Sequence, residues 1–439
     1  MLPGLLASAK KILSQRSSVR IAWHKLKAFA GALRYGFPAR SLTVIGITGT
    51  DGKTTTVAMT AHILHACGVK AGALSTAFFR INGEIIWNET QKTSPSPFVV
   101  QRFLRRLVRA GCTHAVLECS SHGLVQGRVS WTWPAVAALT NTSPEHLDYH
   151  GTMEQYRKDK GILFEMLRGK GTKVLNATDE TFTLYTKIPS SRTVAYGNEK
   201  PQASEWNTER LWLSSIHAFP AATSAIIHTD ASINEMHKLG LRIAGAFNLD
   251  NALCAISCAK ALGLPLDQAT NALGDFPGVP GRIERIDGGQ PFSVFVDFTV
   301  TPASYKRTLQ TVRSMLAPGK CLLVLTGSCG DRMKEKRPLV GKTCGELADV
   351  VVVSNEDPYT EDPQRIIDDV WKGIDQSKTN AHRIEDRLEA IKFLFAAASP
   401  GDAVILCGKG SDTHMWLANG QVPWNERVIA KELLQKLAH

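Results

Sequence analysis

Over most of the chain, short apolar runs rich in β-branched residues alternate with longer segments in which apolar residues recur at helical spacing. The clearest elements of the first part are strands at 42–47, 114–118 and 135–140, and helices at 97–110, 153–166 and 248–262. This alternation is typical of a mainly parallel sheet that is covered by helices. Over 177–243 the polarity changes over shorter distances, which predicts an antiparallel insertion.

The same alternation resumes after a segment rich in proline and glycine, 276–281, which is the best candidate for an interdomain linker. Strands are predicted beyond it at 293–297, 321–326, 350–354 and 403–406. The first forty residues differ, because they are basic and amphipathic and predict a helix that ends near Gly36 and Pro38. We therefore predict an α/β protein with three parts: a helical arm (1–40), a P-loop ATPase-type central domain with a parallel sheet (41–280), and a Rossmann-like C-terminal domain (281–439).

The composition favours anionic partners and argues against several classes of protein. Of 439 residues, 51 are Lys or Arg and 40 are Asp or Glu, so the net charge of +11 suits phosphates, nucleotides, nucleic acid or acidic lipids. The nine cysteines form no CxxC pair, which argues against a disulfide framework or a zinc site. No apolar run approaches the roughly 18 residues of a membrane-spanning helix, and the start of the chain does not read as a secretory signal. We expect a cytoplasmic protein.

The most informative segment is GITGTDGKTTT, residues 46–56, where a predicted strand runs into a glycine-rich loop and then a helix. Glycines allow several backbone N–H groups to converge on phosphate oxygens, and the helix N-terminus adds partial positive charge. Lys53 would reach the β- and γ-phosphates, and the Thr54 hydroxyl would face Mg²⁺. A strict P-loop has glycine where Ile47 stands, and the alternative is a simple turn. We predict a site for a nucleoside triphosphate.

Two further segments place polar side chains after apolar strands. Glu118 ends a strand expected to neighbour the P-loop strand, and a carboxylate there suits Mg²⁺, although a surface glutamate is the alternative. His146 lies in a loop, 140–151, that is rich in Asn, Glu, His and Asp. The residues alone leave His146 open as a metal ligand or as a solvated histidine.

Taken together, nine segments resemble the Mur ligase family, and within it the MurE type of UDP-N-acetylmuramoyl-tripeptide synthetase. In chain order they are GITGTDGKTTT, LECSSHGLVQGRV, TNTSPEHLDYHGTMEQY, AGAFNLDNALCA, GVPGRIE, VDFTVTP, GSCGDRMKEKRP, NEDPYTEDP and GKGSD, within residues 41–439. The resemblance implies ATP-dependent amide formation in peptidoglycan precursor synthesis: a carboxylate attacks the γ-phosphate, and an amine then displaces phosphate from the acyl phosphate. It also implies ATP, Mg²⁺, a muramoyl-peptide-type acceptor and an amino acid as ligands, with no nucleic acid, and we expect a monomer.

The resemblance assigns site residues by position. Catalytic roles fall to Lys53, Glu118, His146 and Lys160; the metal ligands would be Thr54, Glu118, His146 and Lys160, with Lys160 carbamylated by CO₂. Nucleotide contacts are expected at Gly49, Thr50, Asp51, Gly52, Lys53, Thr54, Thr55, Asn141, Asn248, Asn251, Arg282 and Asp297. Substrate contacts are expected at Thr93, Ser94, Ser120, Arg128, Arg332, Glu356, Asp357, Tyr359, Gly408 and Asp412. The alternatives are a solvated lysine at Lys160 and caps, loop residues or surface charges elsewhere. Arg332 and Arg337 could face phosphate or the α-carboxylate of the amino acid, or could be surface charges.

The chain departs from the family pattern at three places. The family's uridine-binding domain is about twice as long as the segment before Leu42, which puts a UDP-linked acceptor in doubt. That segment is expected to pack on the ATPase domain, or to contact a membrane surface or a protein.

The family's Asp-Asn-Pro-Arg is Glu356-Asp357-Pro358-Tyr359, which disfavours meso-diaminopimelate and favours an amine-bearing side chain such as lysine. Val300 replaces a histidine in VDFTVTP, which is expected to alter turnover. Competing hypotheses are another amide ligase, such as a folylpolyglutamate synthetase, and a non-catalytic nucleotide-binding protein.

Overall fold

The computed structural model describes residues 16–88, 90, 92–202, 208–218, 222–230 and 232–437. The chain forms two compact units. The first comprises Met1–His217, Ser224–Leu241 and Phe247–Phe276, and the second comprises Ala218–Thr223, Arg242–Ala246 and Pro277–His439. Residues 1–15 of the predicted arm lie outside the described residues. No helix within these ranges is long and apolar enough to cross a membrane.

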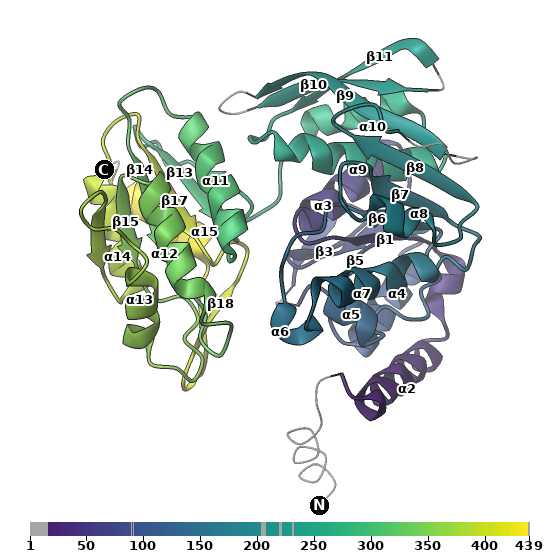
Figure 1. Cartoon of the computed structure of the whole chain (residues 1–439), viewed down its shortest axis with the longest axis horizontal. Helices are drawn as coiled ribbons and strands as arrows, with labels where there is room; N and C mark the ends of the chain where they lie inside the picture. Colours follow the sequence, from purple (N-terminus) through teal and green to yellow (C-terminus); the bar gives the residue numbers. More distant parts are fainter. Residues whose placement is uncertain are drawn as a thin grey trace, which may run out of the picture. The chain divides into compact units, whose positions relative to one another are not determined.

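The first unit is built on an 11-stranded sheet in the order β11-β10-β9-β8-β7-β6-β1-β5-β2-β3-β4 (Figure 1). Its strands are β1 Thr43–Thr48, β2 Ala71–Leu74, β3 Phe78–Ile81, β4 Glu84–Trp87, β5 His114–Glu118, β6 Val136–Leu139, β7 Thr172–Asn176, β8 Arg192–Gly197, β9 Thr208–Ala218, β10 Thr223–Thr229 and β11 Ser232–Leu241. From β2 to β9 the neighbouring strands are parallel, and β1 lies between β5 and β6. The predicted parallel sheet is confirmed.

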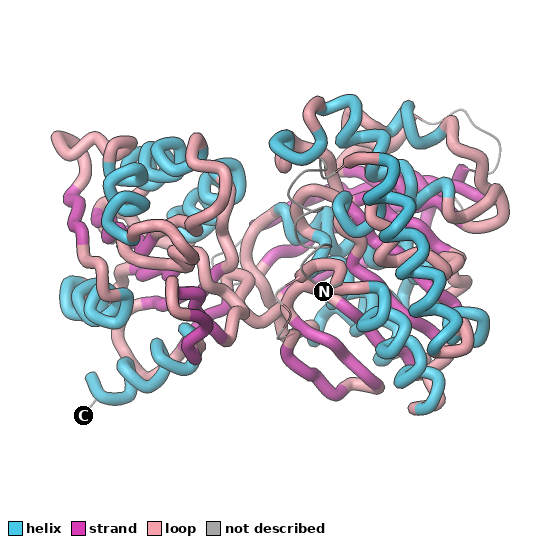
Figure 2. The backbone as a smooth tube through the Cα atoms, turned by 90° about the horizontal axis from the view of Figure 1, so that it is seen from below, coloured by secondary structure: helices cyan, strands magenta, loops and turns pink. Residues whose placement is uncertain are grey.

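Helices cover both faces of this sheet (Figures 1 and 2). They are α2 Ser18–Arg34, α3 Lys53–Ala66, α4 Pro97–Arg109, α5 Ser121–Val125, α6 Leu147–His150, α7 Met153–Glu165, α8 Phe182–Thr186, α9 Phe247–Ala261 and α10 Leu266–Ala272, with 3₁₀ turns at Pro38–Ser41 and Leu273–Asp275. Apolar side chains of α4 and α7 form one core cluster with alternate residues of the central strands. On the other face α3 packs against α9. Helix α2 packs on α4.

The predicted antiparallel insertion over 177–243 is wrong in its first half. β8 is parallel to β7 and β9 is parallel to β8, so both strands extend the parallel sheet. The 15-residue connection from β7 to β8 contains the single-turn helix α8, which is too short to give a helical sequence pattern. Only four residues join β9 to β10 and two join β10 to β11, so the chain reverses direction only in these last strands.

The second unit has a six-stranded sheet in the order β12-β13-β17-β14-β15-β16, in which only β12 is antiparallel to its neighbour. Its elements are β12 Glu284–Ile286, β13 Ser293–Asp297, α11 Pro302–Ser314, β14 Leu322–Thr326, α12 Lys336–Leu347, β15 Val350–Val353, α13 Pro363–Trp371, β16 Asn380–Arg383, α14 Arg387–Ala397, β17 Ala403–Cys407, the hairpin β18 His414–Leu417 and β19 Gly420–Pro423, and α15 Glu426–Leu437. Helices α11, α12 and α13 share one core cluster, whereas α14 and α15 share another. This arrangement confirms the predicted doubly wound fold.

A buried ion pair ties three elements of the second unit together. Arg387, the first residue of α14, donates from Nη2 to Glu426 Oε1 (2.8 Å) and from Nε to Glu426 Oε2 (2.5 Å). The same guanidinium donates to the carbonyl oxygens of Asn355 (3.0 Å) and Cys407 (2.6 Å). Both charged side chains are buried, so the pair is satisfied only while α14, α15 and the end of β17 stay together.

We expect Arg387→Ala to lower the stability of the second unit by about 3–5 kcal/mol, because Glu426 would keep a buried charge without its partner. Denaturant unfolding followed by circular dichroism measures this loss. Arg365→Ala is the matched control, since that side chain is 85% exposed and lies 3.9 Å from Asp362; it should change stability by less than about 0.5 kcal/mol. Equal midpoints for the two variants would contradict the expected role of the pair.

Candidate functional site

The P-loop follows β1 and is shaped by two close contacts. Gly52, which precedes α3, has a φ of 79°, and a Cβ there would lie 2.1 Å from Asn251 Oδ1. A Cβ on Gly49 would lie 1.8 Å from Thr140 Oγ1. Both positions therefore require glycine, and the loop backbone comes close to the loop after β6 and to α9. Lys53 Nζ donates to the Thr50 carbonyl at 2.7 Å, and Thr55 lies buried in the first turn of α3.

Glu118 is the buried centre of this edge of the sheet. Its side chain is 1% exposed and accepts four hydrogen bonds. Thr54 Oγ1 lies 3.1 Å from each carboxylate oxygen, Thr76 N donates to Oε2 at 2.7 Å, and Thr76 Oγ1 donates to Oε1 at 3.0 Å. Because β1 pairs with β5, the P-loop and Glu118 meet at the carboxyl ends of adjacent strands, as predicted. The carboxylate and hydroxyl are hard oxygen donors of the kind that Mg²⁺ prefers.

The loop after β6 is bound to the P-loop by reciprocal hydrogen bonds. Asp51 N donates to Asn141 Oδ1 (3.0 Å), and Asn141 Nδ2 donates back to the Asp51 carbonyl (3.1 Å). Thr140 Oγ1 donates to the same carbonyl at 2.6 Å. The Thr50 hydroxyl lies 3.1 Å from the hydroxyl of Tyr156 on α7. Asn141 therefore lies against the P-loop, where a nucleotide contact would require it.

Lys160, on α7, is almost completely buried. Its Nζ lies 4.3 Å from the centre of the Tyr156 ring, and no carboxylate among the described residues forms an ion pair with it. Burial, together with the positive charge of Lys53, lowers the pKa of the Lys160 amine well below its usual value. The alternative of a solvated lysine is excluded.

Asp159, next to Lys160, proves to be an anchor of α7, although nothing in its sequence neighbourhood distinguishes it. It accepts from Arg16 Nη1 at 2.5 Å and Nη2 at 3.0 Å, and it lies 2.5 Å from His150 Nδ1. His150 Nε2 lies 3.0 Å from the Ser121 hydroxyl. Burial alone would raise the pKa of Asp159, but the hydrogen bonds from His150, Arg16 and Gln155 outweigh it and lower the pKa to about 2.

His146 occupies a different environment from Glu118. Its backbone is left-handed, with a φ of 55°, its side chain is 45% exposed, and Nε2 lies 3.5 Å from Glu145 Oε1. The imidazole ring meets the ring of His122 edge to face, with the centroids 4.8 Å apart. In the part of the chain that the structure describes, no group of three or more His, Cys, Asp or Glu side chains is placed to hold a metal ion. Metal binding by His146 stays a prediction.

The predicted substrate residues of the first unit come together beside Glu118. Ser94 Oγ donates to the Glu118 carbonyl (3.1 Å) and accepts from Ser120 N (3.0 Å). Arg128 Nη1 donates to the Ser94 carbonyl at 2.7 Å, and the hydroxyl oxygens of Thr93 and Thr76 lie 2.9 Å apart. These contacts place the side chains on three connected segments at the same edge of the sheet.

Two of the predicted nucleotide contacts, Asn248 and Asn251, lie on α9, next to the P-loop. Asn251 Nδ2 donates to Asn248 Oδ1 at 3.1 Å, and Asn251 Oδ1 accepts from Thr56 at 3.4 Å. Both asparagines are buried. Asn251 therefore shapes the loop at Gly52, which is a structural role in addition to the expected nucleotide contact.

In the second unit, Arg282 lies two residues before β12, and Asp297 is the last residue of β13. Asp297 accepts from Ile283 N (2.8 Å) and from the Thr299 hydroxyl, while Arg282 Nη1 donates to the Phe298 carbonyl (3.1 Å). Burial raises the pKa of Asp297 to about 6, an effect that the nearby Arg282 charge partly offsets. Val300, in place of the family's histidine, has no polar side-chain atom, and its carbonyl oxygen accepts from Lys336 Nζ at 3.0 Å.

The carboxylates expected at the amino-acid site are already engaged. Both oxygens of Asp357 accept from the buried Lys409 Nζ, at 2.8 and 3.0 Å, and Oδ1 also accepts from Trp416 N. Lys409 Nζ lies 3.4 Å from Asp412 Oδ2. Burial raises the pKa of Asp412 to about 7 despite this lysine.

The neighbouring residues are packed equally closely. Glu356 is buried, accepts from Cys329 Sγ at 3.1 Å and lies directly against Gly408. The Tyr359 ring stacks on Trp416, with the centroids 5.6 Å apart, and the Arg332 guanidinium lies 5.8 Å from the Tyr359 ring centre. Gly408 and Asp412 are predicted substrate contacts, whereas Lys409, which lies between them in the sequence, carries no prediction.

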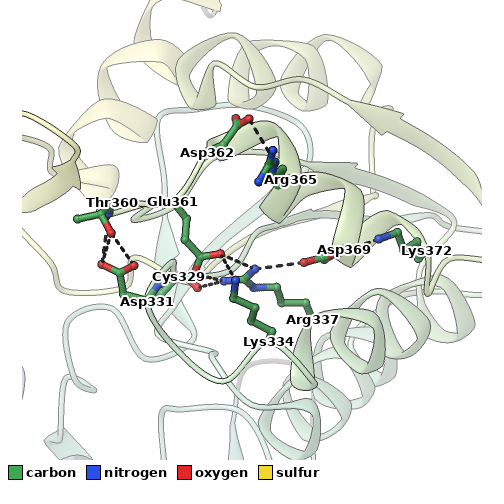
Figure 3. Close-up of polar contacts among 10 residues, drawn as sticks. All are labelled: Cys329, Asp331, Lys334, Arg337, Thr360, Glu361, Asp362, Arg365, Asp369 and Lys372. Atoms are coloured by element: carbon green, nitrogen blue, oxygen red, sulfur yellow. Dashed lines mark hydrogen bonds and ion pairs between the residues drawn. The ribbon is translucent and has the colours of Figure 1, made fainter.

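Arg337 is buried, so the alternative of a surface charge is excluded. Figure 3 shows its guanidinium held by Glu361 and Asp369, and its hydrogen bonds are 2.9 and 3.1 Å to Glu361 and 3.2 Å to Asp369. Arg337 also donates to the Cys329 carbonyl at 3.2 Å. Hydrogen bonds from Arg337 and Lys334 lower the pKa of Glu361 to about 2. We call Lys334, Arg337, Glu361 and Asp369 the Arg337 cluster. It joins residues 327–338 to residues 355–363.

The Arg16–Asp159 contact predicts a specific pH dependence. Because the pKa of Asp159 falls from 3.8 to about 2 in the folded protein, its stabilising effect is complete above about pH 4 and disappears as the pH falls through about 2. We expect Arg16→Gln to lower the thermal unfolding temperature at neutral pH, and this difference from the wild type to shrink with acidification below pH 4. Lys25→Gln, an exposed lysine of α2, should show no such trend, and a pH-independent gap for Arg16→Gln would contradict the prediction.

Comparison with known proteins agrees with the resemblance in the sequence. The family model "Mur ligase middle domain" matches residues 47–259, and "Mur ligase, glutamate ligase domain" matches residues 281–410. The chain is 36% identical to the UDP-N-acetylmuramyl-tripeptide synthetase of Roseiflexus sp. (strain RS-1), over 92% of this chain and 81% of the relative. It is 37% identical to the UDP-N-acetylmuramoyl-L-alanyl-D-glutamate–2,6-diaminopimelate ligase of Thermosynechococcus vestitus, over 92% of this chain and 78% of the relative. A solved structure of such a diaminopimelate ligase is similar with a TM-score of 0.62 and 28% identity, over 91% of this chain and 79% of that one.

Proposed function

Because the chain belongs to the Mur ligase family, we propose that it is an ATP-dependent ligase that joins an amino acid to the carboxylate of a muramoyl-peptide-type precursor of peptidoglycan. The observation that carries this proposal is the buried Glu118 carboxylate, which is hydrogen-bonded to Thr54 in the first turn of the P-loop helix. A phosphate cradle and a buried carboxylate at adjacent strand ends are what phosphoryl transfer to a carboxylate requires.

In the first step an acceptor carboxylate oxygen attacks the γ-phosphorus of ATP, and the bond from that phosphorus to the β,γ-bridging oxygen breaks to release ADP. Lys53 stabilises the charge on the transferred phosphoryl group, and the backbone N–H groups from Gly49 to Lys53 bind the other phosphates. Thr54 and Glu118 would hold Mg²⁺, which supplies charge neutralisation when bound. We propose His146 and a carbamylated Lys160 as ligands of a second Mg²⁺.

In the second step the amine of the amino acid attacks the acyl carbon, and inorganic phosphate leaves. Ser94, Ser120 and Arg128 hold the acceptor beside Glu118, where their hydrogen bonds already fix the surrounding backbone. Asp412 receives the amino group, since a carboxyl with a pKa of about 7 can take up the proton that the ammonium must lose. An amine at Asp357 would have to compete with Lys409.

Tyr359, the last residue of the segment Glu356-Asp357-Pro358-Tyr359, supports a choice of amino-acid substrate. Tyr359 stands where the diaminopimelate-specific pattern has an arginine, so the cation that would bind a distal carboxylate is missing from this position. We propose that lysine is a better substrate than meso-diaminopimelate. We also propose that the enzyme acts as a cytoplasmic monomer, with residues 1–40 available for a peripheral contact.

We expect phosphate release from ATP only when both acceptor and amino acid are present. The assay offers UDP-N-acetylmuramoyl-dipeptide with lysine, meso-diaminopimelate or no amine, and mass spectrometry identifies the product. Lys53→Ala should lower the rate at least about a hundredfold because it removes charge stabilisation in the transition state. Lys70→Ala, an exposed lysine, is the control. Ligation that persists in Lys53→Ala would contradict the proposed role of Lys53 in phosphoryl transfer. No phosphate release with any pair of acceptor and amino acid would favour a non-catalytic nucleotide-binding protein.

We expect ligase activity to depend on CO₂ through Lys160. Burial and the charge of Lys53 lower the pKa of the Lys160 amine and so favour its neutral form, whose nitrogen can attack CO₂, lose a proton and become an anionic carbamate. Removing CO₂ from the buffer should slow the wild type and bicarbonate should restore it, while isotope-labelled bicarbonate should give a carbamate signal in carbon NMR. Lys160→Met should be slow in both buffers and lack the signal, and Lys158→Met, the exposed neighbour, should behave as wild type. A wild-type rate independent of CO₂ would contradict the carbamate.

A further inference from the structure

Helix α2 presents an apolar face to the solvent. Seven exposed residues recur at helical spacing along one side of the helix, and all seven are apolar: Val19, Ala22, Trp23, Leu26, Phe29, Ala30 and Leu33. The other exposed residues of α2, Ser18, Lys25 and Arg34, are polar and flank this side. Val19, Leu26 and Leu33 are each more than half exposed, at 66%, 56% and 60%. The opposite side of the helix carries the buried residues Ala28, Gly31 and Ala32, on the side that packs on α4. The large apolar side chains of α2 therefore lie on the side away from α4, whereas a core-facing helix normally buries them. We call these seven residues the outer face of α2.

Beside the C-terminal end of this face lies an unusual concentration of arginine. Arg34 of α2 and four exposed arginines of α4, Arg102, Arg105, Arg106 and Arg109, surround a pocket of about 530 Å³ that is also lined by Leu33, Tyr35 and Gly36. We call these five residues the arginine cluster. Within the described ranges none of them forms an ion pair with a carboxylate. Residues 1–50 and 97–113 contain no Asp or Glu at all, so the chain itself supplies no local countercharge.

We propose that the outer face of α2 and the arginine cluster together dock on an anionic lipid bilayer. A helix with one apolar face and adjacent cationic side chains lies in the plane of a membrane, with its apolar face among the acyl chains and its charges at the headgroup phosphates. The arginine cluster supplies the phosphate-binding charge and the outer face supplies the buried area. This contact is separate from the ligase reaction proposed above.

The charges favour this occupant over the others. A second copy docked through the same face would bring its arginine cluster against this one, and residues 1–50 and 97–113 supply no carboxylate to that contact. Residues 1–15 contain Lys10 and Lys11 and no acidic residue, so they offer no complementary charge. A nucleic acid would neutralise the arginines but would leave the apolar outer face in water. Only a partner that is both anionic and apolar satisfies both halves of the surface.

Flotation of the full-length protein with vesicles tests the proposal. We expect binding to vesicles of phosphatidylcholine mixed with phosphatidylglycerol, little binding to pure phosphatidylcholine, and release at high salt. Arg105→Gln with Arg109→Gln should lower the partition coefficient about 25-fold, at about fivefold per charge. Leu26→Gln with Leu33→Gln should lower it at least about tenfold. Arg365→Gln and Leu339→Gln, exposed residues of the second unit, are the matched controls and should bind as wild type.

Lys53→Ala should also bind vesicles as wild type, so a failure of membrane docking and a failure of the proposed ligase activity remain distinguishable. Circular dichroism of each variant checks that α2 stays folded. No flotation of the wild type with anionic vesicles would overturn the proposal, and so would binding unchanged in both double variants. Self-association in sedimentation experiments that the leucine variants abolish, without vesicle binding, would assign the face to a second copy instead.

Discussion

The first unit is organised around a buried carboxylate that four hydrogen bonds hold at the end of a central strand. A buried carboxyl group without hydrogen-bond partners costs several kcal/mol, and the hydrogen bonds to Glu118 offset that cost. Its donors come from the P-loop helix and from Thr76 after β2, so three segments are fixed by one side chain. The parallel order of β6, β1, β5 and β2 makes this possible, because it brings the carboxyl ends of all four strands to one edge.

The same principle, a charge removed from water and controlled by its neighbours, recurs around that edge and in the second unit. Burial and Lys53 depress the pKa of the Lys160 amine, whereas burial raises the pKa values of Asp297 and Asp412. Asp159 shows the opposite result of burial, since Arg16 and His150 keep it anionic. A ligase needs groups that change protonation or bind cations near neutral pH, and these shifted side chains are consistent with such chemistry in a member of this family.

The sequence was sufficient for features that depend on local pattern. Strands at 114–118 and 293–297 were predicted at their observed bounds because each is a continuous apolar run between clear breaks. The P-loop and Glu118 followed from glycine spacing and strand ends. Features that depend on distant partners were missed: Asp159 is anchored by Arg16, 143 residues away, and Asp357 by Lys409, 52 residues away. A charged residue in a motif carries no local sign of whether it meets a ligand or another part of its own chain.

The Arg337 cluster in Figure 3 bears on how the second unit can diversify during evolution. It joins the loop that carries Arg332 to the loop that carries Glu356, Asp357 and Tyr359, through one guanidinium shared between Glu361, Asp369 and the Cys329 carbonyl. A new loop introduced on one side alone would leave a buried charge unmatched on the other. A change that replaces one of these loops therefore has to keep a partner for the buried Arg337 guanidinium on the other.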